Sequence, residues 1–329
     1  MAKDTKALYD FVQNNTGKCK ILVVGDVMLD KYYYGEVTRI SPEAPVPITH
    51  VHSQKETLGG AANVAHNLAL LGCNTSIAGY VGDDYHCQSL MDKFISRGID
   101  YRGIVHTEAP TTTKLRVIGG HQQMLRLDFE ETEAVGEPYA ARLLNYVEQR
   151  LTEGLDCVVI SDYAKGACTK EVCQQIIESC HEAKVPIIID PKGSDWTKYI
   201  GTDYITPNLR EMNAALEEPI KNRDESVVTA ARYLMRKYKI RNIVATRSAE
   251  GLSFVTADGV THVPTKAQEV FDVSGAGDTV IAVMALALAG GIEPAEGAWM
   301  ANLAASVVVA KLGTYAVSKE ELLQVLNEQ

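Results

Sequence analysis

The sequence lacks the paired cysteines that bind zinc or carry thiol redox chemistry. Seven cysteines are present, an odd number, and none of them belongs to a CxxC motif. Neither a zinc ribbon nor a thioredoxin-like site is therefore expected. Cys168, Cys173 and Cys180 lie close together in the sequence, but their spacing fits no metal-binding pattern. We interpret the cysteines as reduced thiols of a cytosolic protein.

The sequence also lacks a long hydrophobic run. Its most apolar stretch, residues 280–292, is too short to span a bilayer and is rich in Ala and Gly, which predicts a buried helix instead. The N-terminal residues MAKDTKALYDF include acidic side chains and no apolar core of the kind that signal peptides have. We therefore expect a cytoplasmic protein that makes no contact with a membrane.

An excess of positive charge is absent as well. The formal net charge is −10 at pH 7. Nucleic-acid-binding surfaces are usually basic, so we expect no nucleic acid as a partner. An anionic small molecule is still compatible with this charge if local cations and backbone N–H groups hold it.

Short apolar runs alternate with segments of helical periodicity along most of the chain. This alternation predicts an α/β fold in which helices cover both faces of a parallel sheet. Strands buried on both faces should be continuous apolar runs, and ILVVG and PIIID fit this description. The expected strands are 21–25, 75–81, 157–161, 186–190 and 240–246, and the expected helices are 61–71, 85–97, 170–183, 295–312 and 319–327.

Two segments break this alternation, at about 31–54 and 111–129. Both are rich in β-branched and aromatic residues and contain no plausible helix, so they predict a small second sheet. We expect this sheet to close over the site as a lid, and residues 1–329 to form a single domain that carries it. The strand edges of the lid also offer a surface for a homodimer. The alternative is a pair of surface hairpins without a function.

The sharpest motif is DVSGAGD at residues 272–278, which precedes a long Ala-rich helix. Gly275 and Gly277 permit a tight turn with exposed N–H groups, and the following helix adds the positive end of its dipole. Together they predict an anion site. Asp278 would lie in the first turn of the helix, beside that anion. It would serve there either as an N-cap or as a base that accepts a proton from an attacking hydroxyl.

A dinucleotide-binding loop is the alternative interpretation of this glycine-rich turn. Its GxGxxG pattern would require glycine at position 280, where the sequence has Val280. The motif also lies late in the chain, whereas the dinucleotide fingerprint follows the first strand of its fold. The oxidoreductase interpretation is therefore disfavoured.

The segment LGGAAN, at residues 58–63, predicts a contact with a substrate. Gly59 and Gly60 let a ligand approach the backbone closely, and Asn63 can both donate hydrogen bonds to hydroxyl groups and accept them. A plain helix start explains the same pattern, so this segment by itself is weak support for a binding site.

The segment NLRE, at residues 208–211, predicts a metal contact. Asn208 and Glu211 share one face of the expected helix. They offer the oxygen ligands that Mg²⁺ prefers, often through water. A capping arrangement at the helix start explains the pair equally well.

Taken together, these three segments resemble the signatures of the ribokinase-like (PfkB) carbohydrate kinases. They occur in the family's order, and the resemblance extends over essentially the whole chain. It implies a three-layer α/β/α sandwich with a small β-sheet lid, and it implies ATP and Mg²⁺ as cofactors. A monovalent cation such as K⁺ is left open.

The resemblance implies a role for each matching residue. Asp278 is expected to be the catalytic base, with the N–H groups of Gly275, Ala276, Gly277 and Asp278 stabilising the transferring phosphoryl group. Asn208 and Glu211 are expected to organise Mg²⁺ through water. The implied sugar-binding residues are Asp30, Gly59, Gly60 and Asn63, and the implied nucleotide-binding residues are Asn208, Thr246, Arg247, Gly251 and Asn302. Ser248 departs from the family, which often has glycine at this position.

Four further segments resemble one branch of this family, which phosphorylates O1 of D-glycero-β-D-manno-heptose 7-phosphate on the route to ADP-heptose and lipopolysaccharide. They are residues 25–30, 39–48, 122–128 and 161–166, the last of which places Asp162 at the substrate. Members of this branch are often fused to a nucleotidyltransferase domain. No HxGH-type motif is present here, so a stand-alone kinase is expected.

A sugar that already carries a phosphate needs cations in its site. Taken singly, each basic residue is more simply explained as a solvated surface charge. As a set near the expected mouth of the site, they predict a phosphate site, because Arg binds phosphate through two parallel bonds and Lys acts as a point charge. The first candidates are Lys192 and Arg126, and the others are Lys165, Arg116 and Arg39.

Three other functions are compatible with parts of this pattern. One is a ribokinase-like kinase for another sugar or sugar phosphate. Another is a sugar or nucleotide sensor on the same fold, although a sensor would not need Asp278. A structural interaction protein is the third, and it would not need two glycine-rich cradles. Because fold alone does not determine function, the choice of substrate depends on the resemblance.

Overall fold

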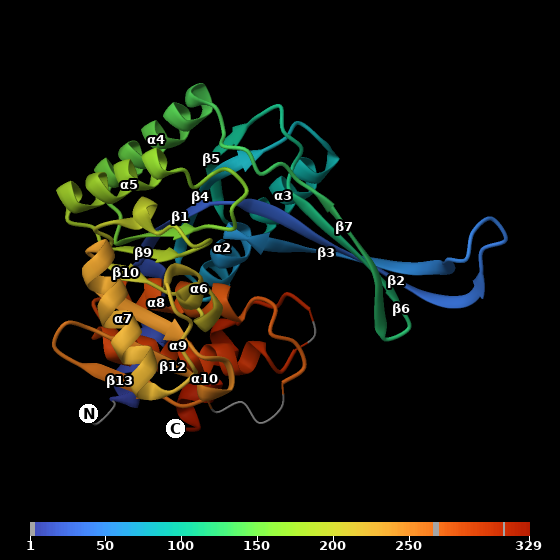
Figure 1. The fold of residues 1–329 in the computed structure, drawn as a ribbon. Helices are drawn as coiled ribbons and strands as arrows, with labels where there is room; N and C mark the ends of the chain where they lie inside the picture. Colours follow the sequence, from blue (N-terminus) through green and yellow to red (C-terminus); the bar gives the residue numbers. More distant parts are fainter. Residues whose placement is uncertain (1–3, 266–269, 312) are drawn as a thin grey trace.

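The computed structural model describes residues 4–265, 270–311 and 313–329. Within them, nine strands form one large sheet (Figure 1). From β11 to β5 every neighbouring pair is parallel, and β12 and β13 are added antiparallel at one edge. In spatial order the strands are β13 (Val260–Val263), β12 (Leu252–Val255), β11 (Asn242–Thr246), β10 (Tyr204–Ile205), β9 (Ile187–Asp190), β8 (Cys157–Ser161), β1 (Lys20–Gly25), β4 (Asn74–Val81) and β5 (Asp100–His106).

Helices cover both faces of this sheet, because its central strands are apolar on both sides. In β1, Ile21 and Val23 join one hydrophobic core, and Leu22 and Val24 join the other. The first core is closed by α1 (Thr5–Asn14), α2 (Ala61–Leu70), α3 (Tyr85–Ser96), α8 (Ala276–Ala289), α9 (Pro294–Val308) and α10 (Lys319–Asn327). The second is closed by α4 (Glu137–Thr152), α5 (Lys170–Ala183), α6 (Leu209–Ala215) and α7 (Asp224–Tyr238).

A second, four-stranded sheet projects from this body, as the long blue and green strands of Figure 1 show. It consists of β3 (Pro47–Gly60), β2 (Val27–Ile40), β6 (Thr113–Gly119) and β7 (Gln122–Phe129), in that spatial order. One residue, Asp26, separates β1 from β2. The small sheet therefore begins at the carboxyl edge of the large one, where ligands of open α/β sheets bind.

The structure confirms the predicted α/β/α layering and the predicted second sheet. The strand predicted at 157–161 and the helix predicted at 170–183 have those bounds in β8 and α5. The helix expected at 295–312 ends earlier, at Val308. Sequence periodicity missed α1, α4, α7, β5, β12 and β13, which are amphipathic or short and have no long apolar run to mark them.

The most apolar segment of the chain is the buried helix that its composition predicts. Every residue from Asp278 to Ala287 in α8 is buried between the large sheet and the neighbouring helices. Among the helices of the described residues, none combines the length and the apolar character that crossing a membrane requires.

Candidate active site

The candidate site lies at the carboxyl edge of the large sheet, where the amino end of α8 meets the base of the small sheet. Polar residues follow the central strands at this edge, with Asp26 after β1 and Asp162 after β8, and Asp190 as the last residue of β9. Because the carboxyl ends of parallel strands meet at one edge, residues far apart in the sequence come together here.

The amino end of α8 is an anion cradle. Its N-cap is Gly275, at a φ of +85°, where a Cβ atom would come within 3.1 Å of Asn63 Nδ2. The N–H of Ala276 donates to the Val273 carbonyl at 3.2 Å. The N–H groups of Gly275, Gly277 and Asp278 form no hydrogen bond within the described residues. Three donors at the positive end of a helix thus remain for an anion.

Asp278 is buried in the first turn of α8 and is 4% exposed. Its Oδ2 accepts a hydrogen bond from Asn63 Nδ2 at 2.7 Å, and its Oδ1 accepts one from the Tyr163 hydroxyl at 2.6 Å. Both partners are side chains, and the N-cap position belongs to Gly275. The capping interpretation of Asp278 is therefore wrong, which leaves the interpretation as a base.

The charge environment of Asp278 suits proton transfer near neutral pH. Burial raises its pKa to about 6, and the hydrogen bonds from Asn63 and Tyr163 oppose that rise. The negative charge of Asp30 raises the pKa further, whereas the positive charge of Lys114 lowers it. A base with a pKa near the working pH is both ionised and able to take a proton.

Asp30, on β2, faces the same space from the small sheet. Its Oδ1 accepts from Arg116 Nη1 at 2.7 Å, and its Oδ2 accepts from the Thr314 hydroxyl at 3.1 Å. A Cβ atom at Gly59 would come within 2.8 Å of Asp30 Oδ2, and one at Gly60 within 2.6 Å of the Asp26 carbonyl. Gly59 therefore lets β3 lie tightly against this carboxylate, and Gly60 lets it lie against the backbone of Asp26, a reason that the sequence did not reveal.

Lys114 is a site residue that sequence reasoning missed. It lies on β6 two residues before Arg116, so both side chains project from one face of the strand. Its Nζ lies 5.8 Å from the centre of the Tyr163 ring, and it forms no ion pair within the described residues. Burial lowers the pKa of Lys114, and the charge of Asp30 partly restores it. The alternation within 111–129 was the signal that could have identified it.

Two of the other predicted cations, Arg126 and Lys165, are already paired with carboxylates. Arg126 Nη2 lies 2.8 Å from Asp128 Oδ2, and about half of the Arg126 side chain is exposed. Lys165 pairs with Glu130 at 2.6 Å. Arg39 is exposed near the outer end of β2, about 30 Å along the strand from Asp30 at the usual rise per residue. The expectation that Arg39 lies near the mouth of the site is therefore wrong.

Lys192 follows β9 and lies beside Glu211. Its Nζ is 3.2 Å from Glu211 Oε1 and 5.8 Å from the centre of the Tyr163 ring. Glu211 belongs to the NLRE segment, so Lys192 is next to the predicted metal residues. The two cations that the sequence grouped thus have different partners, Glu211 for Lys192 and Asp128 for Arg126.

Asn208 and Glu211 form a capping box, which was the alternative to a metal contact in the sequence analysis. Asn208 Oδ1 accepts from the Glu211 N–H, and Glu211 Oε2 accepts from the Asn208 N–H, both at 2.9 Å. Burial raises the pKa of Asp190 well above its ordinary value, and the negative charges of Glu211 and Asp278 raise it further. A cation at this position would relieve that repulsion, so the residues fit a hydrated Mg²⁺.

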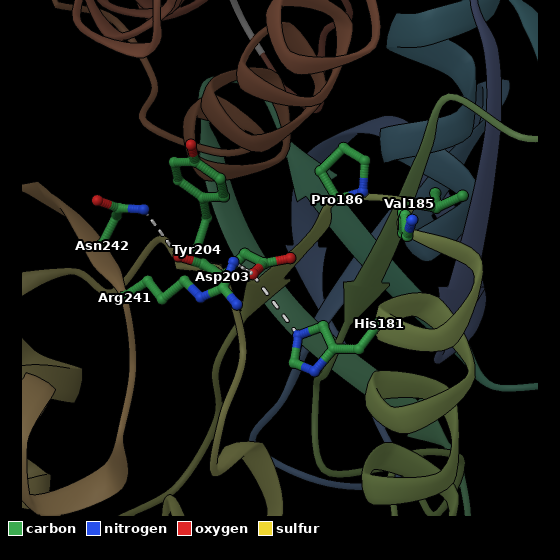
Figure 2. Close-up of a pocket in the computed structure, with 8 residues that line it drawn as sticks. His181, Val185, Pro186, Asp203, Tyr204, Arg241 and Asn242 are labelled. Atoms are coloured by element: carbon green, nitrogen blue, oxygen red, sulfur yellow. Dashed lines mark hydrogen bonds and ion pairs between the residues drawn. The ribbon is translucent and has the colours of Figure 1, made fainter.

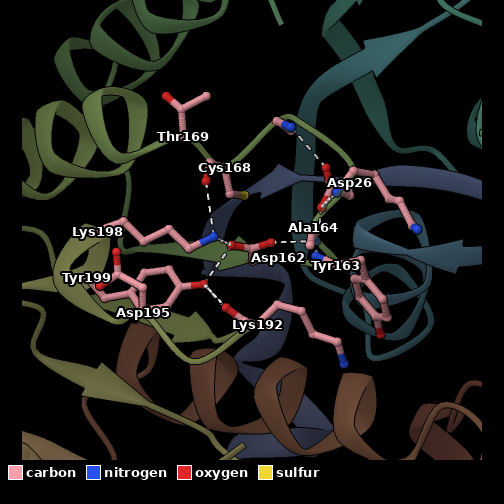
Figure 3. Close-up of polar contacts among 12 residues, drawn as sticks. Asp26, Asp162, Tyr163, Ala164, Cys168, Thr169, Lys192, Asp195, Lys198 and Tyr199 are labelled. Atoms are coloured by element: carbon pink, nitrogen blue, oxygen red, sulfur yellow. Dashed lines mark hydrogen bonds and ion pairs between the residues drawn. The ribbon is translucent and has the colours of Figure 1, made fainter. Parts of the chain in front are cut away.

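Asp162 is brought to the edge of the sheet, but its carboxylate faces inward (Figure 3). It is 1% exposed. Its Oδ1 accepts from the Ala164 N–H at 2.7 Å, and its Oδ2 accepts from the Tyr199 hydroxyl at 2.6 Å and from the Lys198 ammonium. With these donors in place, Asp162 anchors the loop after β8, and a contact of Asp162 with the substrate stays a prediction.

Asp26, Asp162 and Cys168 have potential ligand atoms within 4.8 Å of one another. Asp26 already accepts the N–H groups of Tyr163, Lys165 and Ala167, at 2.7, 3.1 and 3.1 Å. Protein donors therefore surround the two carboxylates, which is the arrangement of a loop anchor. The loop that they hold carries Tyr163 to the candidate base.

The predicted nucleotide loop is a strained turn between β11 and β12. Arg247 is buried and bonds to Asn222 and Asp224, so its guanidinium has a structural role. Ser248 adopts a φ of +54°, which explains why glycine is common at this position. At Gly251, a Cβ atom would lie 2.0 Å from the Val263 carbonyl.

Contacts of Thr246, Gly251 and Asn302 with a nucleotide stay predictions. Thr246 is the last residue of β11, at the same carboxyl edge as the candidate base. Asn302, in α9, is buried and donates its amide to the Pro264 carbonyl at 2.9 Å.

A separate cavity of about 380 Å³ opens at the other edge of the sheet, before β9, β10 and β11 (Figure 2). Its polar centre is Asp203, whose Oδ1 lies 2.9 Å from Arg241 Nη1 and 3.6 Å from His181 Nε2. The cavity therefore lies at the amino ends of the parallel strands, whereas the candidate base lies at their carboxyl ends. The cavity is therefore not part of the candidate site.

Solved structures share this fold at low sequence identity. Phosphofructokinase-2 from Escherichia coli, in complex with substrates and products, superposes with a TM-score of 0.77 at 19% identity, over 94% of this chain and 99% of that one. Ribokinase from Thermotoga maritima gives 0.73 at 20% identity, over 94% and 99% of the two chains. The fold is thus ribokinase-like, as the resemblance implied.

The chain belongs to the pfkB family of carbohydrate kinases, and the match covers residues 18–321. The bifunctional protein HldE of Geobacter sulfurreducens is 42% identical over 317 residues, and that of Shewanella sp. (strain MR-4) is 44% identical over 310 residues. The aligned parts cover 96% and 94% of this chain, and the chain spans 64% of each relative's length.

Proposed function

We propose that this protein transfers the γ-phosphate of ATP to O1 of D-glycero-β-D-manno-heptose 7-phosphate, for ADP-heptose and lipopolysaccharide core synthesis. Membership of the pfkB family supports the phosphoryl transfer. The heptose substrate is supported by the four branch-specific segments of the sequence and by 42–44% identity to the HldE proteins. Those relatives are longer than this chain, and their second activity is not part of the proposal.

One observation carries this proposal: a buried carboxylate with a pKa of about 6 lies in the first turn of a helix whose free N–H groups can hold an anion. Asp278 accepts the proton of O1 as that oxygen attacks the γ-phosphorus, and the bond from phosphorus to the ADP oxygen breaks. The N–H groups of Gly275, Gly277 and Asp278 stabilise the negative charge on the oxygens of the transferring phosphoryl group. ADP leaves with the bonding electron pair.

The nucleotide and its metal belong on the side of the site where α6 begins. We assign Asn208 and Glu211 to Mg²⁺ through water, because they offer oxygen ligands and the carboxylates of Glu211 and Asp278 act on the buried Asp190 there. When bound, Mg²⁺ neutralises charge on the nucleotide phosphates. A monovalent cation such as K⁺ stays in the proposal, since one E. coli phosphofructokinase-2 structure of this fold contains potassium.

The phosphate of the sugar belongs on the side of the small sheet. We assign it to Lys114 and Arg116, in place of Lys192 and Arg126. Lys114 is half-buried and has no ion-pair partner within the described residues, and Arg116 lies beside it on β6. Arg116 is paired with Asp30 but mostly buried, whereas the paired Arg126 is about half exposed. Closure of the small sheet over a bound sugar would exclude water, which otherwise competes for the phosphoryl group.

The outer face of the small sheet supports a proposed homodimer. Leu125, Leu127 and Phe129 alternate along β7 on the face opposite Arg126, and each is 41% exposed or more. Apolar residues in a row on an exposed strand face are typical of an interaction surface. A cytoplasmic location is also proposed, because all seven cysteines are free thiols and six of them are buried.

The substrate is tested by measuring ADP release with ATP and Mg²⁺ against a panel of sugars. The panel holds D-glycero-D-manno-heptose 7-phosphate, free heptose, fructose 6-phosphate, fructose 1-phosphate and ribose. Turnover confined to the heptose phosphate is the expected result. Turnover of another sugar would keep the kinase and discard the heptose. An absence of turnover with ATP still bound would support a sensor instead.

A further inference from the structure

Tyr163 is not assigned a role by the family motifs, yet its hydroxyl is one of the two groups that touch the candidate base. It lies in the loop between β8 and α5 and donates to Asp278 Oδ1 at 2.6 Å. The other group, Asn63, donates to Oδ2 from α2. Each carboxylate oxygen therefore has one donor, and these donors come from elements on different sides of the sheet edge.

The loop that carries Tyr163 is held on both sides of this residue. Asp26 accepts the Tyr163 N–H at 2.7 Å and the N–H groups of two later residues. Asp162 accepts the N–H of Ala164, whose φ of +56° is unusual for a residue with a Cβ atom. Such a conformation persists where the surrounding structure fixes it. Two buried carboxylates thus set the position of a single phenol ring.

The electrostatic surroundings keep the Tyr163 hydroxyl protonated. Burial, and then the negative charges of Asp278 and Asp190, raise the pKa of the phenol well above its ordinary value. The ammonium groups of Lys114 and Lys192 each lie 5.8 Å from the centre of its ring. The hydroxyl is therefore available to Asp278 as a hydrogen-bond donor and not as a base.

We propose that Tyr163 is a positioning residue for the phosphoryl transfer, whose hydroxyl orients the Asp278 carboxylate and keeps it ionised in its buried site. The charged groups that face Asp278 are Asp30 from β2, Lys114 from β6 and Asp190 from β9. Burial and the negative charge of Asp30 favour protonation of Asp278, and the positive charge of Lys114 opposes it. A donor directly on Oδ1 opposes protonation, and it leaves the remaining lone pairs for the attacking hydroxyl.

The test compares Tyr163→Phe with Tyr199→Phe. Both substitutions remove one phenol hydroxyl that donates at 2.6 Å to a buried aspartate, but Tyr199 serves Asp162 and not the base. The pKa of Asp278 is measured by carboxyl ¹³C NMR on the protein without substrate, with Asp278→Asn to assign the signal. This measurement does not depend on which sugar is phosphorylated, so failure of the substrate assignment would leave it interpretable.

In Tyr163→Phe, the pKa of Asp278 should rise by about 1 to 2 pH units. This rise corresponds to the usual free energy of one hydrogen bond to a charged group. With the sugar phosphate that is turned over, kcat at pH 7 should fall about two- to tenfold and recover at higher pH, while KM stays within about twofold. In Tyr199→Phe, the pKa of Asp278 and the shape of the pH profile should match the wild type.

Replacing Tyr163 by 3,5-difluorotyrosine gives a second test that keeps the ring in place. Its more acidic hydroxyl is a stronger donor, so the pKa of Asp278 should fall. An unchanged pKa of Asp278 in both Tyr163 variants would overturn the proposal. An equal rise in Tyr163→Phe and Tyr199→Phe would also overturn it, because the effect would then be a general loosening of the loop.

Discussion

The large sheet and the small sheet contribute different kinds of residue to one site. From the large sheet and its helices come groups that are fixed by internal partners, such as Asp278 between Asn63 and Tyr163. From the small sheet comes Lys114, a cation without an ion-pair partner in the described chain, next to the Asp30–Arg116 pair. In the proposed function, the body performs the chemistry and the small sheet selects the sugar. Four experiments test this division of roles.

The largest effect is expected in the body, for Asp278→Asn. Loss of the base should lower kcat by about 10²–10⁴-fold with little change in KM, because the amide keeps the shape of the side chain but cannot take the proton. Steady-state ADP release measures this. Wild-type turnover in the variant would remove Asp278 from the mechanism. The variant should be more stable than the wild type at pH 7, since a buried charge is removed.

In the small sheet, Lys114→Met should act on binding and not on chemistry. We expect kcat/KM for the sugar phosphate to fall about 10- to 100-fold, the range for one hydrogen bond to a charged group, with the KM for ATP unchanged. Arg126→Ala is the matched control on the neighbouring strand. Its exposed ion pair should contribute little, so its effect should stay within about twofold. A reversed order of the two effects would restore Arg126 as the phosphate ligand.

The pH dependence of kcat/KM should report the base. Because the active form of Asp278 is ionised and its pKa is about 6, activity should be full above that pH and should be lost as the pH falls through it. Below it, the rate should drop about tenfold per pH unit. The folded protein holds this proton more tightly than the unfolded chain, so the contribution of Asp278 to the free energy of unfolding decreases as pH rises from its ordinary carboxyl pKa to about 6. A profile that is flat from pH 5 to 8 would contradict this assignment.

The smallest effect on activity is expected on the outer face of the small sheet, for Leu127→Asp. The face that carries Lys114 is untouched, so kcat should stay within about twofold of the wild type. If the apolar face holds two copies together, the charge should shift the mass measured by light scattering from dimer to monomer. A monomeric wild type would rule out the dimer, and Lys55→Asp on β3 serves as a surface control.

The sequence predicted the main elements of the fold because each depends on local periodicity. Apolar runs such as residues 21–25 and 157–161 are strands, and the glycine-rich turn at 272–278 opens a buried helix. The register in which the strands pair could not be predicted in this way. The pairing of β2 with both β3 and β6 aligns Asp30 with Lys114, and this alignment depends on contacts between segments far apart in the chain.

Two of the predicted motifs meet in the structure, although the roles of their residues stay predictions. The GGAAN and DVSGAGD segments do meet, through the bond from Asn63 to Asp278. Asp162 and Arg247 have the expected positions along the chain, but their charged groups face inward to protein partners. Lys192 was grouped with the sugar cations because basic residues look alike in a sequence, whereas the fold places it beside Glu211.

By itself, the sequence determined the family, the layered α/β architecture and the residue that can act as base, because glycine spacing, apolar runs and motif order are local properties of the chain. Only the tertiary structure decided which charged side chains pair with other residues of the protein and which remain for a ligand. It made Tyr163 a partner of Asp278, and it left Lys114 without an ion pair within the described residues. The physical reason is that burial and pairing depend on neighbours that folding brings from distant parts of the chain.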